Sequence, residues 1–389
     1  MTPDRSAGGS GARHSLDSTD RILVIAPHPD DETLAVGGLL QQAAARGAAV
    51  RVLFLTDGEN NPWAQRAVEG RWRINRADRV RWGARRRQES LAALGCLGLR
   101  AECAVFLAFP DQGLTDLLLR GGETLIQTLV TEVERWRPTA LLIPSASDIH
   151  PDHNAAAVMS GFALARAPNS TRGLLPLSYV VHERVSLSEG AGVKIALTPR
   201  ERETKHRAIL EHASQLRLKG RFVRGFARET ESFSLLPAPP PPGHHHPLRD
   251  AFVDRGVLHV EIARPHRIWR GAPVLNVAFE DPGRARGRLV LALPERSSFI
   301  EVRDATSTMA PAHARASADR ANLRLEVPVP ALRRSSPAVR TYIKLERPVE
   351  RRLGFFDQAG WLAVRVLDMA RSDAFSAEER VMAGRSDGS

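Results

Sequence analysis

Two patterns of hydrophobic residues divide the chain. Between residues 20 and 235, short runs of β-branched and aliphatic residues alternate with longer segments of helical character. Such continuous apolar runs are typical of strands that are buried on both faces of a parallel sheet. We predict strands at residues 22–26, 49–55, 105–108, 140–143, 179–183 and 193–197, and helices at 33–45, 86–94, 122–137, 154–164 and 200–216.

This alternation of strands and helices predicts an α/β domain over residues 20–235. Short connections between alternating strands and helices favour a Rossmann-like, mostly parallel sheet that is flanked by helices. The first predicted strand is not followed by a GxGxxG sequence, so a dinucleotide site is not indicated.

A different pattern begins near residue 250. Short β-rich runs such as VLHVEI, VLNVAF and RLVLAL are separated by Gly, Pro, Asp and Arg turns, and no helical pattern lies between them. We predict an antiparallel β-sandwich domain at residues 250–371. A linker rich in Pro and His, residues 236–249, precedes it, and residues 1–19 and 372–389 read as tails. Because the linker is stiff, we expect two separable domains with their own cores.

Composition limits the cellular compartment and the partners that we expect for the protein. A hydrophobic content of 43% is enough for two cores, and two cysteines cannot form a disulfide framework, so we expect a cytoplasmic protein. No run of about 18 apolar residues predicts an integral membrane segment. The formal net charge is +11, but only four of the 55 basic residues are Lys and no groove-reading motif accompanies them, so we expect no nucleic-acid partner.

Metal-capable side chains gather after two of the predicted strands. His28, Asp30 and Asp31 follow the first strand, and the sequence DIHPDH, residues 148–153, follows the fourth. The carboxyl ends of parallel strands meet at one edge of the sheet, where open α/β sheets bind ligands. Adjacent carboxylates repel each other unless a positive charge lies near them, so the two clusters predict a divalent cation.

These residues also carry a family resemblance. The sequences APHPDDE at 26–32 and HPDH at 150–153, with LTDG at 55–58, FPD at 109–111 and the KxxAxxxHxSQ spacing at 205–215, resemble the PIG-L (LmbE-like) family. That family contains zinc-dependent N-acetylglucosamine-type de-N-acetylases, and the resemblance covers residues 20–235. One departure is Asp148, which stands where some family members have an aromatic hydroxyl.

The resemblance implies a role for each residue of the two clusters. His28, Asp31 and His153 are the implied ligands of Zn²⁺, with another divalent metal such as Fe²⁺ as an alternative. Asp30 is then the general base. His150 is expected to stabilise the tetrahedral intermediate as a cation, and Asp152 to orient His150 and keep it charged.

Three further residues are expected to bind substrate: Arg86, Asp111 and His212. Asp111 follows the third predicted strand, so its carboxylate is expected to face the pocket and accept hydrogen bonds from sugar hydroxyls. The segment at residues 60–87, rich in Arg and Trp, has two interpretations. It could cap the pocket, or it could be a solvated helical face with tryptophans packed beneath it.

The leading functional hypothesis is a metal-dependent amidohydrolase. It would remove the acetyl group from an N-acetylated amino sugar or glycoconjugate and give a free amine and acetate. Two His and one carboxylate also describe non-haem iron oxygenases, which is one alternative. The other is an inactive carbohydrate-binding protein whose β domain does the binding.

Overall fold

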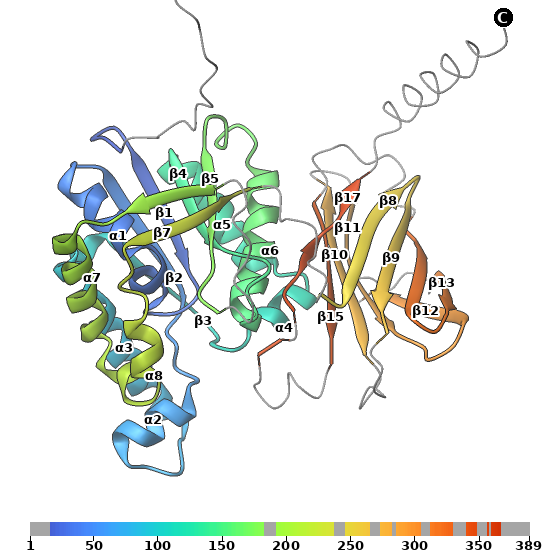
Figure 1. Cartoon of the computed structure of the whole chain (residues 1–389), viewed down its shortest axis with the longest axis horizontal. Helices are drawn as coiled ribbons and strands as arrows, with labels where there is room; N and C mark the ends of the chain where they lie inside the picture. The colour runs from blue at the N-terminus through green and yellow to red at the C-terminus, as the bar shows by residue number, and fades with distance from the viewer. Residues whose placement is uncertain are drawn as a thin grey trace, which may run out of the picture.

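The computed structural model describes residues 16–182, 192–236, 246–264, 273–281, 285–304, 312–329, 340–347, 356–357 and 359–366. Most of the expected tails, and residues 237–245 of the expected linker, lie outside the described residues. An N-terminal α/β domain and a C-terminal β domain lie side by side (Figure 1).

The α/β domain is built on a seven-stranded sheet with the order β3-β2-β1-β4-β5-β7-β6. The pairs from β3 to β5 are parallel, whereas β7 is antiparallel to both β5 and β6. The sheet is therefore mostly parallel, as predicted. Its strands are β1 (Arg21–Ala26), β2 (Ala49–Thr56), β3 (Ala104–Phe109), β4 (Ala140–Pro144), β5 (Leu175–Tyr179), β6 (Gly192–Ala196) and β7 (Thr230–Leu235).

Helices cover both faces of this sheet, and each face has its own buried apolar cluster. Ile22 and Val24 of β1 pack towards α1, α3 and α7, whereas Leu23 and Ile25 pack towards α4, α5 and α6. The continuous apolar runs follow from this burial on both faces. The helices are α1 (Asp31–Ala45), α2 (Pro62–Glu69), α3 (Arg76–Cys96), α4 (Leu114–Leu119), α5 (Glu123–Trp136), α6 (Pro151–Arg166), α7 (Pro199–Glu211) and α8 (Ala213–Arg224), with a 3₁₀ turn at Ala101–Cys103.

The details differ from the sequence-based prediction in the second half of this domain. The fifth strand lies at Leu175–Tyr179 and not at 179–183, and β7 was not predicted. The helix predicted at 200–216 is two helices, which meet at the non-helical His212. Helix α6 starts at Pro151, earlier than predicted, because proline is well suited to the first turn of a helix.

The prediction of a β-sandwich is wrong. The C-terminal strands form one continuous, curled sheet with the order β16-β15-β10-β11-β12-β13-β14-β9-β8-β17. The terminal strands β16 and β17 are separated only by Val364, yet they pair with β15 and β8 at opposite ends of the order. The sheet is β8 (Leu248–Asp254), β9 (Val257–Ala263), β10 (Val274–Asp281), β11 (Ala285–Ala292), β12 (Ser298–Asp304), β13 (Ala312–Ala318), β14 (Asn322–Pro328), β15 (Arg340–Glu346), β16 (Leu362–Ala363) and β17 (Arg365–Val366).

The two domains share a buried interface along α6. Ala278 of β10 and Trp361 belong to the same apolar cluster as α5 and α6, although the β domain also has a core of its own. The side chain of Arg288 is 2% exposed and donates hydrogen bonds to the carbonyl oxygens of Leu118 and Gly121, both at 3.1 Å. The linker therefore joins domains that are in extensive contact.

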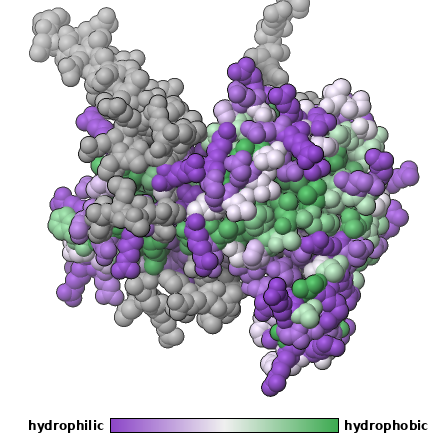
Figure 2. Space-filling model, turned by 180° about the vertical axis from the view of Figure 1, so that it is seen from behind, coloured by the Kyte–Doolittle hydropathy of each residue, from purple (hydrophilic) through white to green (hydrophobic). Residues whose placement is uncertain are grey.

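On the face seen in Figure 2, hydrophilic residues surround a band of apolar ones on the α/β domain. Within the part of the chain that the structure describes, no helix has the length and apolarity needed to cross a membrane.

Candidate metal centre

Five strand ends supply the candidate site. His28 follows β1, Gly58 follows β2, Asp111 follows β3, the 148–153 cluster follows β4 and His182 follows β5. In the sheet order the chain runs from β1 out to β3 and then returns to β4 on the other side of β1. The site thus lies across the point where the strand order reverses, which is where open α/β sheets form their binding crevice.

Three side-chain atoms converge at the centre of this crevice. The Nδ1 atom of His28 lies 3.3 Å from Oδ2 of Asp31 and 3.2 Å from Nε2 of His153, and that oxygen and Nε2 are 3.1 Å apart. A tetrahedral metal with ligands at about 2.0 Å has ligands about 3.3 Å from one another. The donor set and its spacing therefore fit a divalent metal such as zinc, and all three side chains are buried.

Other combinations of donors in the same cluster also lie close together. Three sets have ligand atoms within 4.8 Å of one another, namely His28 with His150 and His153, Asp148 with His153 and His182, and His28 with Asp111 and Asp152. All three distances in the triplet of His28, Asp31 and His153 lie between 3.1 and 3.3 Å, which is the spacing that a tetrahedral metal needs.

Each of the two histidines has a carboxylate on its other ring nitrogen. Oδ1 of Asp111 lies 3.2 Å from Nε2 of His28, and Oδ2 of Asp148 lies 3.1 Å from Nδ1 of His153. Burial lowers the pKa of His153, but Asp31 and Asp148 outweigh this and raise the pKa to about 9. Carboxylates in this arrangement fix the orientation of histidine ligands in metal sites.

Asp148 also holds the surrounding loops together. Its carboxylate accepts hydrogen bonds from the backbone N–H groups of His150 at 2.8 Å, Val181 at 3.0 Å and His182 at 3.1 Å. Burial would raise the pKa of Asp148, but His153 and His182 hold it well below its usual range. Sequence reasoning noted Asp148 only as a departure from the family pattern and missed this role.

Asp30 lies beside the triplet and lines the cavity next to it. Its Oδ2 atom is 3.1 Å from Nη2 of Arg86. Burial and the neighbouring Asp31 raise the pKa of Asp30, and Arg86 opposes the shift. A carboxylate with a raised pKa is suited to accept and return a proton near neutral pH.

Arg86 links two loops of the site. Its guanidinium donates to the carbonyl oxygens of Pro29 at 2.9 Å and Gly58 at 3.0 Å. Gly58 has a φ of +61°, and a Cβ atom there would lie 1.7 Å from Nη1 of Arg86. Glycine is therefore required at this position, which explains its place in the LTDG sequence.

His150 occupies the N-cap position of α6. Its Nδ1 atom accepts a hydrogen bond from the backbone N–H of Asp152 at 3.2 Å, so the ring proton of the neutral imidazole lies on Nε2. Burial, with His28, His153 and His182 nearby, holds the pKa of His150 well below 6.5. This arrangement favours a neutral imidazole that donates through Nε2, and the role of His150 as a cation stays a prediction.

The carboxylate of Asp152 does not hold His150 as expected. It accepts hydrogen bonds from the backbone N–H groups of Gln112 at 2.7 Å and Leu114 at 3.0 Å, and it lies 3.4 Å from Nε2 of His28. The hydrogen bond from Asp152 to the His150 ring comes from the backbone N–H and not from the carboxylate. The reason is that α6 begins at Pro151, which turns the Asp152 side chain towards α4.

The three residues expected to bind substrate differ in their surroundings. Arg86 and Asp111 line a cavity of about 60 Å³ next to the triplet. The residues that line this cavity do not include His212. His212 is 1% exposed, with its Nε2 atom 3.8 Å from Glu32, and burial lowers its pKa to about 3. Gln215 and Lys219 of the following helix line the cavity instead.

Sequence reasoning also missed His182. It follows β5, and its ring centroid lies 5.2 Å from that of His150 and 5.0 Å from that of His153. A histidine just beyond the carboxyl end of a parallel strand was the available signal, but the predicted strand extended over it.

The segment at residues 60–87 was given two interpretations, a cap on the pocket or a solvated helical face with tryptophans packed beneath it. Asn61 and Trp63 line a cavity beside the site, whereas Trp82 is fully buried.

Comparisons with known proteins identify this region. The PIG-L family model, described as GlcNAc-PI de-N-acetylase, matches residues 23–161. The 1D-myo-inositol 2-acetamido-2-deoxy-alpha-D-glucopyranoside deacetylase of Mycolicibacterium smegmatis is 31% identical over 182 residues, which cover 42% of this chain and 60% of that protein. The protein of the same name from Mycolicibacterium vanbaalenii is 32% identical over 154 residues, covering 35% of this chain and 51% of that protein.

The similarity of this chain to solved structures is weaker than its similarity to these two relatives. N,N'-diacetylchitobiose deacetylase from Pyrococcus horikoshii is 20% identical, with 56% of this chain and 83% of that chain covered and a TM-score of 0.44. The chain spans less than two thirds of the length of the two Mycolicibacterium relatives. Residues 23–161 match the PIG-L family, and this matched region contains every residue of the triplet and of the 148–153 cluster.

Proposed function

We propose that this protein is a zinc-dependent de-N-acetylase that hydrolyses the acetamide of an N-acetylated amino sugar or sugar conjugate. The observation that carries the proposal is the convergence of His28, Asp31 and His153, with Asp30 beside them and outside the ligand set. Hydrolysis of an amide requires an activated water, a base for its proton and a donor for the developing negative charge.

His28, Asp31 and His153 would hold the metal. A bound Zn²⁺ lowers the pKa of its water and polarises the carbonyl of the substrate, and Fe²⁺ is an alternative for the same donors. Asp111 and Asp148 would keep the two imidazoles in the orientation that the metal needs, because each carboxylate contacts the ring nitrogen on the far side.

Asp30 would transfer the protons. It takes a proton from the attacking water and later gives a proton to the departing sugar amine. Arg86 contacts the Asp30 carboxylate and donates to the Pro29 carbonyl, so it is assigned a positioning role in addition to the predicted contact with substrate. Its buried charge also keeps the pKa of Asp30 from rising further.

His150 would stabilise the tetrahedral intermediate. Since its Nδ1 atom accepts from the Asp152 backbone, its Nε2–H is left to donate to the oxyanion. A neutral donor that is fixed before the reaction begins costs little reorganisation during it. Asp152 supports this arrangement through its backbone and holds the Gln112 loop through its carboxylate.

The amide and amino groups around the cavity suit a sugar. Asn61, Gln112, Gln215 and Lys219 line the cavity next to the triplet and can exchange hydrogen bonds with hydroxyl groups. The two Mycolicibacterium relatives are named as deacetylases of an acetamido-sugar inositol, which supports the same class of substrate.

A screen of acetate release across N-acetylglucosamine and its conjugates tests the proposal. We expect acetate from the zinc-loaded protein, none after chelation, and the same rate with and without oxygen. A rate that depends on oxygen would favour the oxygenase alternative. Sugar binding without any acetate release would favour the inactive carbohydrate-binding alternative.

A further inference from the structure

The segment rich in Arg and Trp forms a small lobe that projects from the α/β domain (Figure 1). We define this lobe as residues 62–81, which comprise α2, the loop that follows it and the start of α3. Figure 2 shows the lobe from behind, with apolar residues set among hydrophilic ones. None of the residues that are assigned to the proposed reaction belongs to the lobe, so its surface has no role in that chemistry.

Two tryptophans of the lobe are held by one arginine. The Cζ atom of Arg66 lies 5.0 Å from the ring centroid of Trp63 and 4.9 Å from that of Trp72. The Nε atom of Arg66 also donates a hydrogen bond to the Trp72 carbonyl oxygen at 2.8 Å. Trp63 is nevertheless 64% exposed and Trp72 is 75% exposed. The cation therefore orders two indole rings that remain on the surface.

The backbone of the lobe is fixed at the helix ends. Asn61 caps α2 by accepting from the N–H of Ala64 at 3.3 Å, and Gly70 ends this helix in the left-handed conformation with a φ of +65°. Asn75 and Asp78 form a capping box at the start of α3, with two hydrogen bonds of 3.0 Å. A lobe with ordered ends presents its side chains at a low entropic cost.

The lobe carries a high positive charge. It contains six arginines and two acidic residues, Glu69 and Asp78, which leaves a net charge of +4. Both acidic residues are already paired, because the guanidinium of Arg81 lies 2.7 Å from Glu69 and 2.9 Å from Asp78. The remaining arginines therefore give the surface of the lobe its charge.

Three exposed arginines of the lobe have no structural explanation. Within the residues that the structure describes, no carboxylate lies within ion-pair distance of Arg73, Arg76 or Arg79. Arg76 and Arg79 lie in the first four residues of α3, where the positive end of the helix dipole disfavours cations. Helix stability does not account for these two residues, whereas an anionic partner does.

An apolar side chain of α8 extends the surface of the lobe. Leu218 is 53% exposed and lines the same cavity as Trp63, so the two side chains are neighbours. The indole of tryptophan combines an apolar body with an N–H donor, and it is enriched where proteins meet lipid headgroups. Exposed tryptophans next to arginines are the composition of a surface that lies on an anionic bilayer.

A bilayer fits this surface better than a nucleic acid does. Proteins that bind single strands place their basic and aromatic side chains in a groove that follows the phosphate backbone. The lobe is instead a projection of the domain (Figure 1). A projection with exposed indoles can enter the headgroup region of a flat surface, and the arginines around it then meet anionic headgroups.

We propose that the lobe docks this protein reversibly on the surface of an anionic lipid bilayer. Trp63 and Trp72 enter the headgroup region, and Arg73, Arg76 and Arg79 contact the lipid phosphates. Such a peripheral contact requires no membrane-spanning helix. It is also independent of the proposed function, since the lobe holds none of the residues of the proposed reaction.

Co-sedimentation of the full chain with lipid vesicles tests the proposal. We expect binding to vesicles of equimolar phosphatidylcholine and phosphatidylglycerol, and binding about tenfold weaker or less to vesicles of phosphatidylcholine alone. Because salt screens exposed charges, binding to the anionic vesicles should weaken as the ionic strength rises. No binding to anionic vesicles at low ionic strength would overturn the proposal.

Two variants of the lobe separate its contributions. Trp72→Ala should weaken binding to anionic vesicles by about tenfold, because it removes an indole from the headgroup region. The triple variant Arg73→Gln, Arg76→Gln and Arg79→Gln should weaken it by about a hundredfold at low ionic strength, since each arginine near such a surface contributes about fivefold. Zinc content and thermal stability should match the wild type in both. Wild-type vesicle binding in both variants would overturn the proposal.

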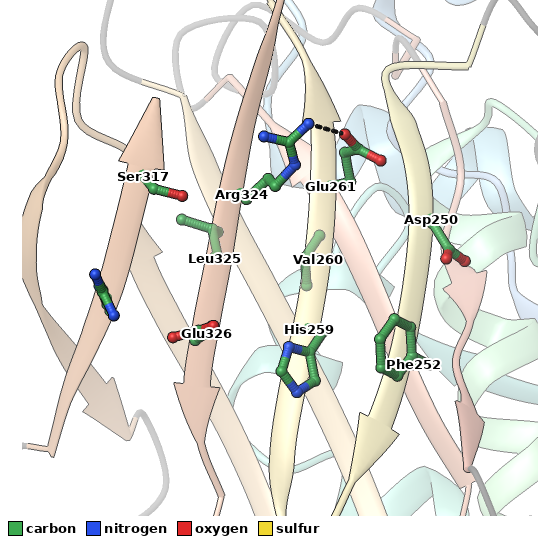
Figure 3. Close-up of a pocket in the computed structure, with 10 residues that line it drawn as sticks. Asp250, Phe252, His259, Val260, Glu261, Ser317, Arg324, Leu325 and Glu326 are labelled. Atoms are coloured by element: carbon green, nitrogen blue, oxygen red, sulfur yellow. Dashed lines mark ion pairs between the residues drawn. The ribbon is translucent and has the colours of Figure 1, made fainter. Parts of the chain in front are cut away.

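The C-terminal domain offers matched controls. Phe299→Ala removes an aromatic side chain that is 76% exposed. The triple variant Arg303→Gln, Arg315→Gln and Arg324→Gln removes three exposed arginines of β12, β13 and β14, among them Arg324, which pairs with Glu261 at 3.0 Å (Figure 3). We expect vesicle binding within about twofold of the wild type in both controls. Equal losses in the lobe variants and their controls would mean that overall charge drives binding, and would overturn the role of the lobe.

A single-stranded DNA oligonucleotide tests the other anionic partner. We expect the full chain to bind it more weakly than the anionic vesicles, and we expect Trp72→Ala to leave this binding unchanged. Tighter binding to the oligonucleotide than to the vesicles, lost in both lobe variants, would assign the lobe to a nucleic acid and overturn the proposal.

Discussion

At the scale of single residues, the candidate site divides its carboxylates by the contacts they make. Asp31 faces His28 and His153, Asp111 and Asp148 face the far ring nitrogens of those histidines, and Asp30 faces Arg86. Four carboxylates in one crevice can therefore have three different tasks, because each task depends on the partner that the side chain meets.

The first prediction concerns the ligands. His153→Ala removes one of three donors, and two donors are too few for tight zinc binding. Metal analysis should find about one zinc per chain in the wild type and none in the variant. His206→Ala, in helix α7 and outside the cluster, is the control and should keep its zinc. Full zinc content in His153→Ala would contradict the assignment.

The second prediction separates the base from the ligands. Asp30→Asn keeps the shape of the side chain but cannot take a proton, so turnover should fall by about two orders of magnitude or more. Zinc content should stay the same, because Asp30 lies outside the triplet. Steady-state kinetics and metal analysis on the same preparation check both parts, and unchanged turnover would show that another group takes the proton.

The sequence predicted most of the residues that form the candidate site, but it did not predict which residues they contact. The two strand ends predicted that the clusters at 28–31 and 148–153 meet, and the family resemblance implied His28, Asp31 and His153 as the ligands. The structure brings these three side chains together. The partners of Asp148, Asp152 and His212 depend on where α6 begins and where α7 ends. One or two residues of error in a helix boundary change the direction of a side chain completely.

At the scale of elements, the loop after β4 is tied to the end of β5. Asp148 makes this connection through the N–H groups of Val181 and His182, and the same carboxylate contacts the ring of His153. The position of His153, a proposed metal ligand, therefore depends on a strand that supplies no residue to the triplet.

Asp148→Asn tests this connection. The amide places an N–H₂ group where backbone donors now point, so we expect the loop to loosen and metal affinity to fall about 10- to 100-fold. Competition with a chelator measures the affinity. Asp20→Asn is the control, since Asp20 is buried, accepts from Thr139 at 2.8 Å and lies at the other edge of the sheet. An equal loss of metal affinity in both variants would contradict the role of Asp148.

The elements themselves were predicted best where the apolar runs are continuous. Strands β1, β2 and β4 carry buried side chains on both faces, so their pattern is unambiguous. Strand β7, TESFSL, alternates buried and exposed residues at the antiparallel end of the sheet, and its polar positions hid it. The single helix predicted over 200–216 missed the break at His212, because no proline or glycine marks it.

At the scale of the whole molecule, buried charges join the two domains. Arg166 of α6 pairs with Glu280 of β10, and the Asp357 carboxylate, which pairs with Lys344 of β15, accepts a hydrogen bond from Asn154 of α6 at 2.8 Å. Burial lowers the pKa of Arg288, which lies in the same interface, to about 10. The sequence predicted neither this interface nor the single curled sheet, because alternation shows which face of a strand is buried and not what covers it.

Arg288→Met tests the interface. The variant leaves the Leu118 and Gly121 carbonyl oxygens without their donor, and we expect it to lower the free energy of unfolding by roughly 3 kcal/mol. Urea unfolding measures the loss. Arg286→Met removes a neighbouring arginine that is largely exposed and pairs with Glu123 at 3.0 Å, so it should cost less than about 1 kcal/mol. Equal losses in the two variants would contradict a structural role for the buried guanidinium.

The interface also bears on the expectation of separable domains. A chain that ends near Pro237 would expose the α6 surface that now packs on Ala278 and Trp361. We predict that this truncated protein is less soluble than the full chain and binds zinc more weakly. Sedimentation and metal analysis check this. A soluble truncated protein with full zinc content would show that the C-terminal domain is dispensable for the metal site.

The central claim is that the triplet and Asp30 together hydrolyse an acetamide. The most direct test measures acetate and free amine in the same reaction, for the zinc-loaded wild type, the chelated wild type and zinc-loaded Asp30→Asn. The account predicts equal amounts of acetate and amine from the first and at most about one hundredth of that rate from the other two. Equal rates in all three, or acetate released without a matching amine, would contradict it.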